Sequence, residues 1–330
     1  STAIHARRAG QGLMPETTPR IPASMRIADW PDWPEYGLVD DLLPTLERWL
    51  ADGRRFALAT LVEIEGTSPR PLGSEMAIND LGECAGYVSG GCVEAEVAQQ
   101  ALGVLADGEP RYLDYGSGSP VLDIQLACGG RIGILVRTLR DARTQVARWR
   151  QARDARRPLK VVTDWSVGQR EGEIARQYRP TTRLVIAGGD PVSLALARLA
   201  DAFGFEIVLL RPNGPEAPPQ GIRLLAYDRR PIEQALADLK LGAWCTVYTL
   251  THDADTDHAV LMHALDSPAF CIGALGSRRK SELRLQRLRD AGLGRDQLSR
   301  LHAPAGLPIG GSTPQEIALS ILAEITLERR

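Results

Sequence analysis

The chain has 330 residues, of which 44% are hydrophobic and 24% are charged, and its formal net charge at pH 7 is −2. This length predicts two domains, and the near-neutral charge excludes a general attraction to nucleic acid or to anionic membranes. We find no run of about 18 apolar residues that could span a bilayer and no pattern of a secretory signal. The five cysteines lack zinc-type pairing, so we expect a cytoplasmic protein with reduced thiols.

The N-terminal part of the chain combines expected helices with short expected strands. Residues 1–36 are rich in proline, arginine and small residues and show no period, which is typical of a tail. Apolar spacing predicts helices over residues 39–51 and 93–108, and strands over residues 56–64 and 76–79.

A β-hairpin is expected near the end of this part. Residues 121–126 alternate apolar and polar side chains, a CGG turn follows, and residues 131–137 return as a strand, which places Cys128 at the bend. The sequence therefore predicts a smaller N-terminal α/β domain with a hairpin over residues 37–140. A charged, partly helical connector is expected over residues 141–180.

From residue 181 onward, strand-like runs alternate with helical stretches. The strand-like runs are 183–187, 206–210, 222–225, 245–250 and 269–275, and the helical stretches include 191–203, 231–239 and 256–265. This alternation predicts an α/β domain over residues 181–330 with a Rossmann-like parallel sheet that helices cover on both faces. Thr313, Pro314 and Glu316 predict a capped start of the last helix.

A first candidate site lies in the N-terminal domain. Cys92 follows two glycines at the start of a predicted helix, where unpaired N–H groups and the helix dipole favour a thiolate. Cys128 lies at a glycine turn, where the backbone can approach a ligand closely. Arg70 lies in a loop rich in Ser, Pro and Gly that can present its guanidinium to a phosphate. The alternative is that both thiols are small buried groups at tight turns.

A second candidate site lies in the C-terminal domain. Arg278, Arg279 and Lys280 fall at the N-terminal end of a predicted helix. Cations there oppose the helix dipole, which makes sense if a phosphate or carboxylate binds at that end; the alternative is a solvated basic edge. A metal site in "LTHDADTDHAVLMH" is disfavoured, because His258 and His263 are five residues apart and do not share one helical face.

Residues 183–210 have the strand–turn–helix–strand shape of a dinucleotide-binding unit, but the G-x-G-x-x-G fingerprint fails. Asp190 and Ser193 stand at the second and third glycine positions, and Arg211 replaces the acidic residue that reads the ribose. Asp190 is also expected to cap the helix that begins at Pro191, and thereby to take the amides that a pyrophosphate would use. We therefore expect NAD(P) to bind weakly or not at all.

Several co-linear segments together resemble the xanthine dehydrogenase accessory factor family, XdhC/CoxI-like. They read "GTSPRPLGSEMAI", "GYVSGGCVEAEV", "CGGRIGILV", "IGALGSRRK" and "LHAPAGLPIGGSTPQEIALSILAEI", and they cover most of residues 55–327. The resemblance implies an accessory protein, rather than an enzyme that turns over substrate. Such a protein would bind molybdenum cofactor transiently, as molybdopterin or its cytosine dinucleotide, and support its sulfuration and insertion. Expected clients are hydroxylases of the xanthine dehydrogenase, aldehyde oxidoreductase or carbon monoxide dehydrogenase type.

The resemblance also implies where the cofactor is handled. The cofactor-binding residues would be Arg70, Gly90, Gly91, Cys92, Glu94, Cys128, Arg278, Arg279 and Lys280. Cys92 is the candidate molybdenum ligand, because soft metals select thiolates. Implied partners are the client hydroxylase, a cysteine desulfurase, a cofactor biosynthesis protein and a second copy of the chain in a homodimer. Two alternatives stay open: an NAD(P)-dependent oxidoreductase that uses the Rossmann-like domain, and an assembly factor with no ligand.

Overall fold

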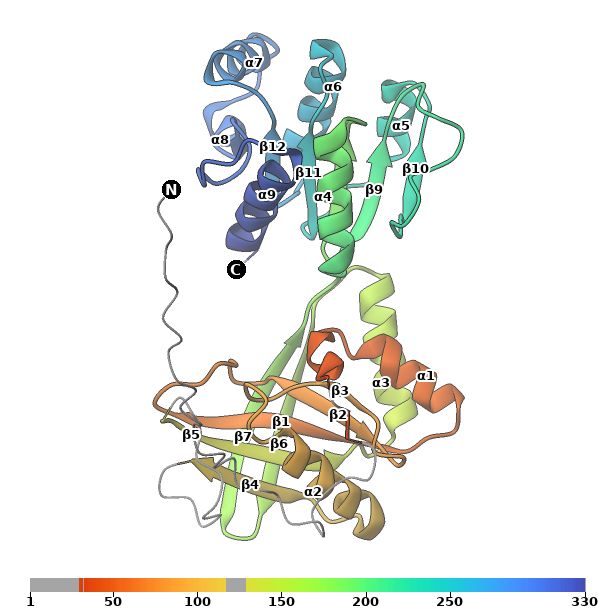
Figure 1. Cartoon of the computed structure of the whole chain (residues 1–330), viewed down its shortest axis with the longest axis vertical. Coiled ribbons are helices and arrows are strands. Elements are labelled where there is room, and N and C mark those ends of the chain that lie inside the picture. The colour runs from red at the N-terminus through yellow and green to blue at the C-terminus, as the bar shows by residue number, and fades with distance from the viewer. Residues whose placement is uncertain (1–29, 32, 117–128, 330) are drawn as a thin grey trace, which may run out of the picture. The chain divides into compact units, whose positions relative to one another are not determined.

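The structure is a computed structural model, and it describes residues 30–31, 33–116 and 129–329. The chain divides into two compact units, and Figure 1 labels most of their helices and strands. The first unit contains the described residues up to Gln151 together with Leu159–Tyr178. The second contains Ala152–Pro158 and the residues from Arg179 onward.

An antiparallel sheet forms the centre of the first unit. Its described strands have the order β3-β2-β1-β5-β4. They are β1 (Phe56–Glu65), β2 (Glu75–Asn79), β3 (Cys84–Gly86), β4 (Arg111–Gly116) and β5 (Arg131–Thr138). The strands expected over residues 56–64, 76–79 and 131–137 are therefore confirmed, with ends that shift by one residue.

Within the described residues, β5 pairs with two strands of the sheet. The expected arm at residues 121–126, like Cys128, lies outside the described residues. The described neighbours of β5 are β1 on one side and β4 on the other. The alternation of β4 was missed because it carries Arg111 and Asp114, and Asp114 forms an ion pair with Arg131 of β5.

Helices cover both faces of this sheet. Ala57, Ala59 and Leu61 of β1 face α2 (Glu94–Asp107) in one apolar cluster. Phe56 and Leu58, on the opposite face of β1, belong to a second cluster with α1 (Leu43–Ala51) and α3 (Ala142–Asp154). The strand β1 thus contributes side chains to both apolar clusters, because successive side chains of a strand point to opposite faces of the sheet.

Two segments of the first unit differ from expectation. The helix expected over residues 39–51 begins only at Leu43, after a short 3₁₀ helix, η2 (Glu35–Leu38). The stretch after α3 forms an antiparallel hairpin of β6 (Leu159–Val167) and β7 (Arg170–Tyr178). Its burial alternates between half-buried and exposed positions along β6, without a fully buried face, so the strands gave no strong hydrophobic signal.

The second unit is built on a parallel sheet, as expected. Its described strands are β8 (Arg183–Ala187), β9 (Glu206–Leu210), β10 (Ala226–Asp228), β11 (Cys245–Thr249), β12 (Cys271–Ala274) and β13 (Leu301–His302). Their spatial order is β10-β9-β8-β11-β12-β13, and every pair is parallel. Counted within the unit, this is 3-2-1-4-5-6, the order of Rossmann folds. The strand expected at residues 222–225 was displaced, since β10 begins at Ala226.

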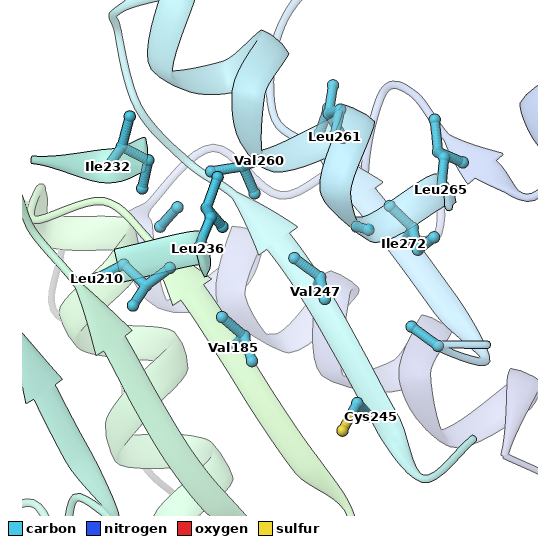
Figure 2. Close-up of a cluster of buried hydrophobic side chains, with 14 of the residues drawn as sticks. Val185, Leu210, Ile232, Leu236, Cys245, Val247, Val260, Leu261, Leu265 and Ile272 are labelled. Carbon is cyan, nitrogen blue, oxygen red and sulfur yellow. The ribbon is translucent and has the colours of Figure 1, made fainter. Parts of the chain in front are cut away.

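The helices of the second unit lie on both faces of the sheet. α4 (Pro191–Ala202) and α9 (Pro314–Glu328) pack on one face. α5 (Ile232–Asp238), α6 (Ala254–Leu265) and α7 (Arg278–Asp290) pack on the other, where Figure 2 shows side chains of α5 and α6 meeting those of the strands. A short helix, α8 (Arg295–Leu298), precedes β13.

The predicted cap of α9 is confirmed. The Glu316 amide donates to Thr313 Oγ1 at 3.3 Å, and the Thr313 amide donates back to Glu316 Oε2 at 3.0 Å, with Pro314 at the first helical position. Among the described helices, none is long and apolar enough to cross a membrane.

Candidate functional site

Loops of the first unit gather at one end of its sheet. The register pairs Arg131, at the start of β5, with both Glu65 at the end of β1 and Gly116 at the end of β4. It also pairs Met76, near the start of β2, with Gly86 at the end of β3. Where the last residue of one antiparallel strand pairs with the first residues of its neighbour, the loops attached to both lie at the same end of the sheet. The loop over residues 66–74, the loop over residues 87–93 and Gly129–Gly130 therefore lie at this end, which we call the loop end.

The loops of the loop end touch one another. A Cβ atom on Gly130 would lie 2.2 Å from the Thr67 carbonyl oxygen, and one on Gly90 would lie 3.4 Å from Pro69 Cγ. The loop over residues 66–74 thus contacts both of its neighbours, and glycine at position 130 is required for the approach. Gly91 has φ +97° with open space where a side chain would stand, so its backbone is accessible to a ligand.

Cys92 carries an exposed thiol at the loop end. Its amide donates to Ser89 Oγ at 3.3 Å, and α2 begins after it, at Glu94, so Cys92 precedes the helix that it was expected to start. The other free cysteines of the described chain are half-buried or buried: Cys84, Cys245 and Cys271. Burial raises the pKa of the Cys84 thiol to about 12. Of these described thiols, Cys92 is therefore the one that a ligand can reach.

Glu94 is fully buried and holds the loop that carries Cys92. Its carboxylate accepts hydrogen bonds from the Ser89 amide at 2.7 Å and the Ser89 hydroxyl at 2.8 Å. It also accepts the amides of Val88 at 3.3 Å and Val93 at 3.2 Å. Because these bonds fill the carboxylate's acceptor positions, the geometry supports positioning of the loop rather than direct contact with a ligand.

Arg70 reaches across the loop end to the 87–93 loop. Its guanidinium carbon lies 4.2 Å from the centroid of the Tyr87 ring, and it donates to Tyr87 Oη at 3.4 Å and to the exposed Asp40 carboxylate at 3.1 Å. Within the described residues, its buried Nε has no hydrogen-bond partner. Neither Asp40 nor Tyr87 was predicted as a site residue; Tyr87 stands inside the "GYVSGGC" motif and could have been found there.

The nucleotide-binding turn of the second unit is occupied by its own side chains. Asp190 caps α4, as predicted, by accepting the Ser193 amide at 2.8 Å and the Ser193 hydroxyl at 2.7 Å. The Arg211 side chain lies over the turn, since a Cβ atom on Gly189 would lie 2.3 Å from Arg211 Nε. A pyrophosphate approaching this turn would meet a carboxylate and would have to displace Arg211.

The basic cluster Arg278–Lys280 is exposed at the start of α7. It follows β12, so it lies at the carboxyl edge of the parallel sheet. No ion pair joins these side chains to another described residue. Arg284 of the same helix is instead anchored, through Nε to Asp257 Oδ2 at 3.1 Å and through Nη1 to the Leu275 carbonyl at 2.7 Å.

The segment "LTHDADTDHAVLMH" has a structural role. Asp257 is buried and accepts hydrogen bonds from Thr249 and Thr251 as well as Arg284. His263 Nε2 bonds to the Leu239 carbonyl at 2.9 Å. In the parts of the chain that the structure describes, no group of three or more His, Cys, Asp or Glu side chains could hold a metal ion.

An antiparallel unit with a loop end, followed by a Rossmann unit, defines a two-unit α/β protein. Residues 49–116 match the XdhC and CoxI family, and residues 184–325 match the XdhC Rossmann domain. The chain is 32% identical over 315 residues to the molybdenum cofactor insertion chaperone PaoD of Escherichia coli, covering 90% of this chain and 92% of that protein. The chain therefore belongs to the XdhC and CoxI family.

Further relatives extend this comparison. The uncharacterized Escherichia coli protein YqeB is 28% identical over 275 residues, which cover 82% of this chain and 43% of YqeB. A probable xanthine dehydrogenase subunit of Bacillus subtilis is 24% identical over 330 residues, covering 86% and 96% of the two chains. The crystal structure of a xanthine dehydrogenase from Bacillus halodurans has a TM-score of 0.73 at 23% identity, covering 87% of this chain and 95% of that one. This last likeness concerns the fold alone.

Proposed function

We propose that this protein binds molybdenum cofactor as its cargo and supports its sulfuration and insertion into a client molybdenum hydroxylase. The observation that carries the proposal is the loop end, where the exposed Cys92 thiol and Arg70 stand on loops that contact each other. The relative PaoD, a molybdenum cofactor insertion chaperone, aligns with this chain over nearly its whole length and supports the same cargo.

The loop-end residues fit the chemistry of such a cargo. Molybdenum bound by dithiolene sulfur is soft and accepts a thiolate ligand, which Cys92 can supply from an exposed position. Open space at Gly91 lets a flat pterin approach the backbone. Arg70 carries a fixed positive charge on the loop over residues 66–74, which suits an anionic group of the cargo. Cys128, in the CGG motif, is proposed as a second thiol that handles the cofactor.

The second unit is proposed to carry an anion site of its own, of a chemistry that fits the anionic tail of such a cofactor. Arg278, Arg279 and Lys280 have no acidic partner among the described residues, and Ser277 caps α7 through the Lys280 amide at 3.3 Å. The tail is either the phosphate of molybdopterin or the cytosine dinucleotide. We further propose that the protein acts in the cytoplasm as a homodimer, with a cysteine desulfurase as sulfur source and a cofactor biosynthesis protein as donor.

The alternatives make different demands on the second unit. An NAD(P)-dependent oxidoreductase is favoured by the Rossmann strand order, but it requires a free turn at Gly188–Asp190, where Asp190 and Arg211 now lie. An assembly factor with no ligand would not account for the exposed Cys92 thiol or for the cations of residues 278–280, which have no acidic partner among the described residues. We therefore favour a cofactor chaperone over both alternatives.

A reconstitution experiment tests the proposed function. A hydroxylase that lacks its cofactor is incubated anaerobically with molybdenum cofactor and a sulfur donor, with and without this protein, and substrate turnover is followed. We expect the protein to raise the yield of active enzyme, while the protein alone oxidises no NAD(P)H. Equal yields with and without the protein would contradict the proposal, and NAD(P)H oxidation by the protein alone would favour the oxidoreductase.

A further inference from the structure

A short segment ahead of α1 lies against the loop end. It comprises residues 35–40, which include η2, and we call it the strap. No residue of η2 is buried, and the Leu38 side chain is almost fully exposed. Tyr36 packs against the apolar cluster that α2 covers, which holds the first part of the strap. The second part is held by contacts with the loops of the loop end.

Two such contacts join the strap to loops that carry candidate cofactor-binding residues. A Cβ atom on Gly37 would lie 3.5 Å from Tyr87 Cδ1, so the backbone of the strap rests on that ring. At the end of the strap, the Asp40 carboxylate accepts a hydrogen bond of 3.1 Å from Arg70 Nη2. The arginine that the proposed function assigns to an anionic group of the cargo is thus already bound to an anion of the chain.

The ion pair between Asp40 and Arg70 is easily broken. The Asp40 side chain is 80% exposed, and that of Arg70 is 22% exposed. Water screens such a pair, and ordering two side chains costs entropy, so an exposed pair shifts an equilibrium by about fivefold at most. The exposure of Asp40 also means that a ligand can reach the position beside Arg70 Nη2. A phosphate carries about twice the charge of a carboxylate, so an oxyanion of this kind can replace Asp40.

We propose that Asp40 is an internal anion that occupies Arg70 in the free protein and leaves when an oxyanion group of the cargo binds there. Release of Asp40 removes the contact at the end of the strap, so residues 35–40 loosen as the cargo enters. Because both anions need the same guanidinium, the bound cargo and the closed strap exclude each other. This inference rests on the proposed function for the identity of the cargo, but not for the exchange of anions at Arg70.

Anaerobic titration with molybdenum cofactor tests the exchange, because loss of a competitor and loss of a support change the affinity in opposite directions. Asp40→Asn keeps the size of the side chain but loses its charge, so we expect it to bind cofactor about two- to fivefold more tightly than the wild type. Glu35→Gln removes an exposed charge from the same strap and should bind as the wild type does. Equal or weaker binding by Asp40→Asn would overturn the proposal.

The same titration identifies the oxyanion group. Cofactor treated with a phosphatase lacks the phosphate of the tail but keeps the oxo groups at its metal. The gain in Asp40→Asn should persist with this cofactor if the oxo groups meet Arg70, and it should disappear if the phosphate does.

Hydrogen exchange of the strap gives a readout that needs no cofactor. The Gly37 amide donates to the Pro34 carbonyl at 2.9 Å. The Val39 amide donates to the Tyr36 carbonyl at 3.3 Å, so exchange at both amides follows the opening of η2. We expect both to exchange about two- to fivefold faster in Asp40→Asn than in the wild type.

Inorganic phosphate separates this inference from the proposed function. When phosphate replaces chloride at constant ionic strength, the strap amides of the wild type should exchange faster, because phosphate competes with Asp40 for Arg70. Exchange that phosphate leaves unchanged would overturn the proposal. If the wild type binds no molybdenum cofactor, the proposed function fails, and the result with phosphate alone decides the exchange of anions.

Discussion

The Glu94 carboxylate, on the first residue of α2, accepts a hydrogen bond of 2.7 Å from the Ser89 amide. This bond ties the start of the helix to the loop that presents Cys92. Because Glu94 is fully buried, the loop is fixed from the protein side, and the thiol on its outer side is held in place before any ligand arrives.

Replacing Glu94 by glutamine should release this loop. An amide keeps the shape but loses the negative charge that several N–H and O–H donors share, so we expect a loss of about 2–4 kcal/mol in the free energy of unfolding. Denaturant unfolding and hydrogen exchange of the Ser89 amide measure the effect. Glu96→Gln is the matched control, because Glu96 lies on the same helix and accepts a hydrogen bond from Gln100 of that helix rather than from the 87–93 loop within the described residues. Equal stability of the two variants would refute the role given to Glu94.

Replacing Asp190 by glycine should open the nucleotide-binding turn. The variant loses the cap on Ser193, which costs at most about 1 kcal/mol because glycine is tolerated at the cap, and it removes a carboxylate that repels phosphate. We expect calorimetric titration to show no micromolar NAD(P) binding by the wild type and tighter binding by the variant. Of the two nucleotides, NADP should gain more, since Arg211 can attract its 2′-phosphate. Micromolar binding by the wild type would reverse this interpretation.

Neutralising Arg278 and Arg279 together, as glutamines, should weaken binding of the cofactor tail. Each cation removed from an anion site costs roughly 1–2 kcal/mol, so the double variant should bind inorganic phosphate or released cofactor about thirtyfold more weakly or worse. Its unfolding midpoint should match that of the wild type, because both side chains are exposed. Arg289→Gln with Arg295→Gln removes two exposed charges elsewhere and should leave binding unchanged. The anion site fails if both double variants bind alike.

The stability of the second unit should fall at alkaline pH because of His302. Its hydrogen bond to Cys271 and its ion pair with Glu324, at 3.3 Å, raise its pKa to about 10, above the value near 6.5 in an unfolded chain. The charged histidine therefore stabilises the folded state fully below about pH 6.5, and this contribution is lost as pH rises towards 10. We expect a decrease on the order of 2–4 kcal/mol across this window.

His302→Gln provides the control for that titration. Glutamine can still donate to Glu324 but does not titrate, so the variant should be less stable at neutral pH and nearly independent of pH between about 7 and 10. Unfolding curves measured across this range compare the two proteins. The same slope in both would assign the pH dependence to other groups.

Much of the fold follows from local patterns. The apolar runs at β8, β9 and β11 and the caps at Asp190 and Thr313 are encoded by neighbouring residues, so the Rossmann unit was predictable. The β6–β7 hairpin and β4 were not. Their stability comes from contacts that are distant in sequence, such as Arg170 with Asp114 and the stacking of Tyr112 on Trp165.

The candidate site was only partly predictable for the same reason. Glycine-rich loops and Cys92 stand out in the sequence, but the gathering of their loops depends on strand register. The contact of Arg70 with Tyr87 and the burial of Glu94 arise from that register. A carboxylate next to a cysteine suggests a ligand set when read in sequence. In the fold, the buried Glu94 carboxylate holds the 87–93 loop from the interior of the protein.

The molybdenum and pterin content of anaerobically purified protein tests the central claim most directly. We predict near-stoichiometric cofactor in the wild type and in Cys84→Ser, whose thiol is half-buried in β3, and a milder defect in Cys128→Ser. Cys92→Ser should lose cofactor at least tenfold, because even the loss of an outer-shell partner of a metal ligand costs about 10–100-fold in affinity. If Cys92→Ser retains as much molybdenum and pterin as the wild type, and the wild-type thiol resists alkylation, the cofactor is handled elsewhere.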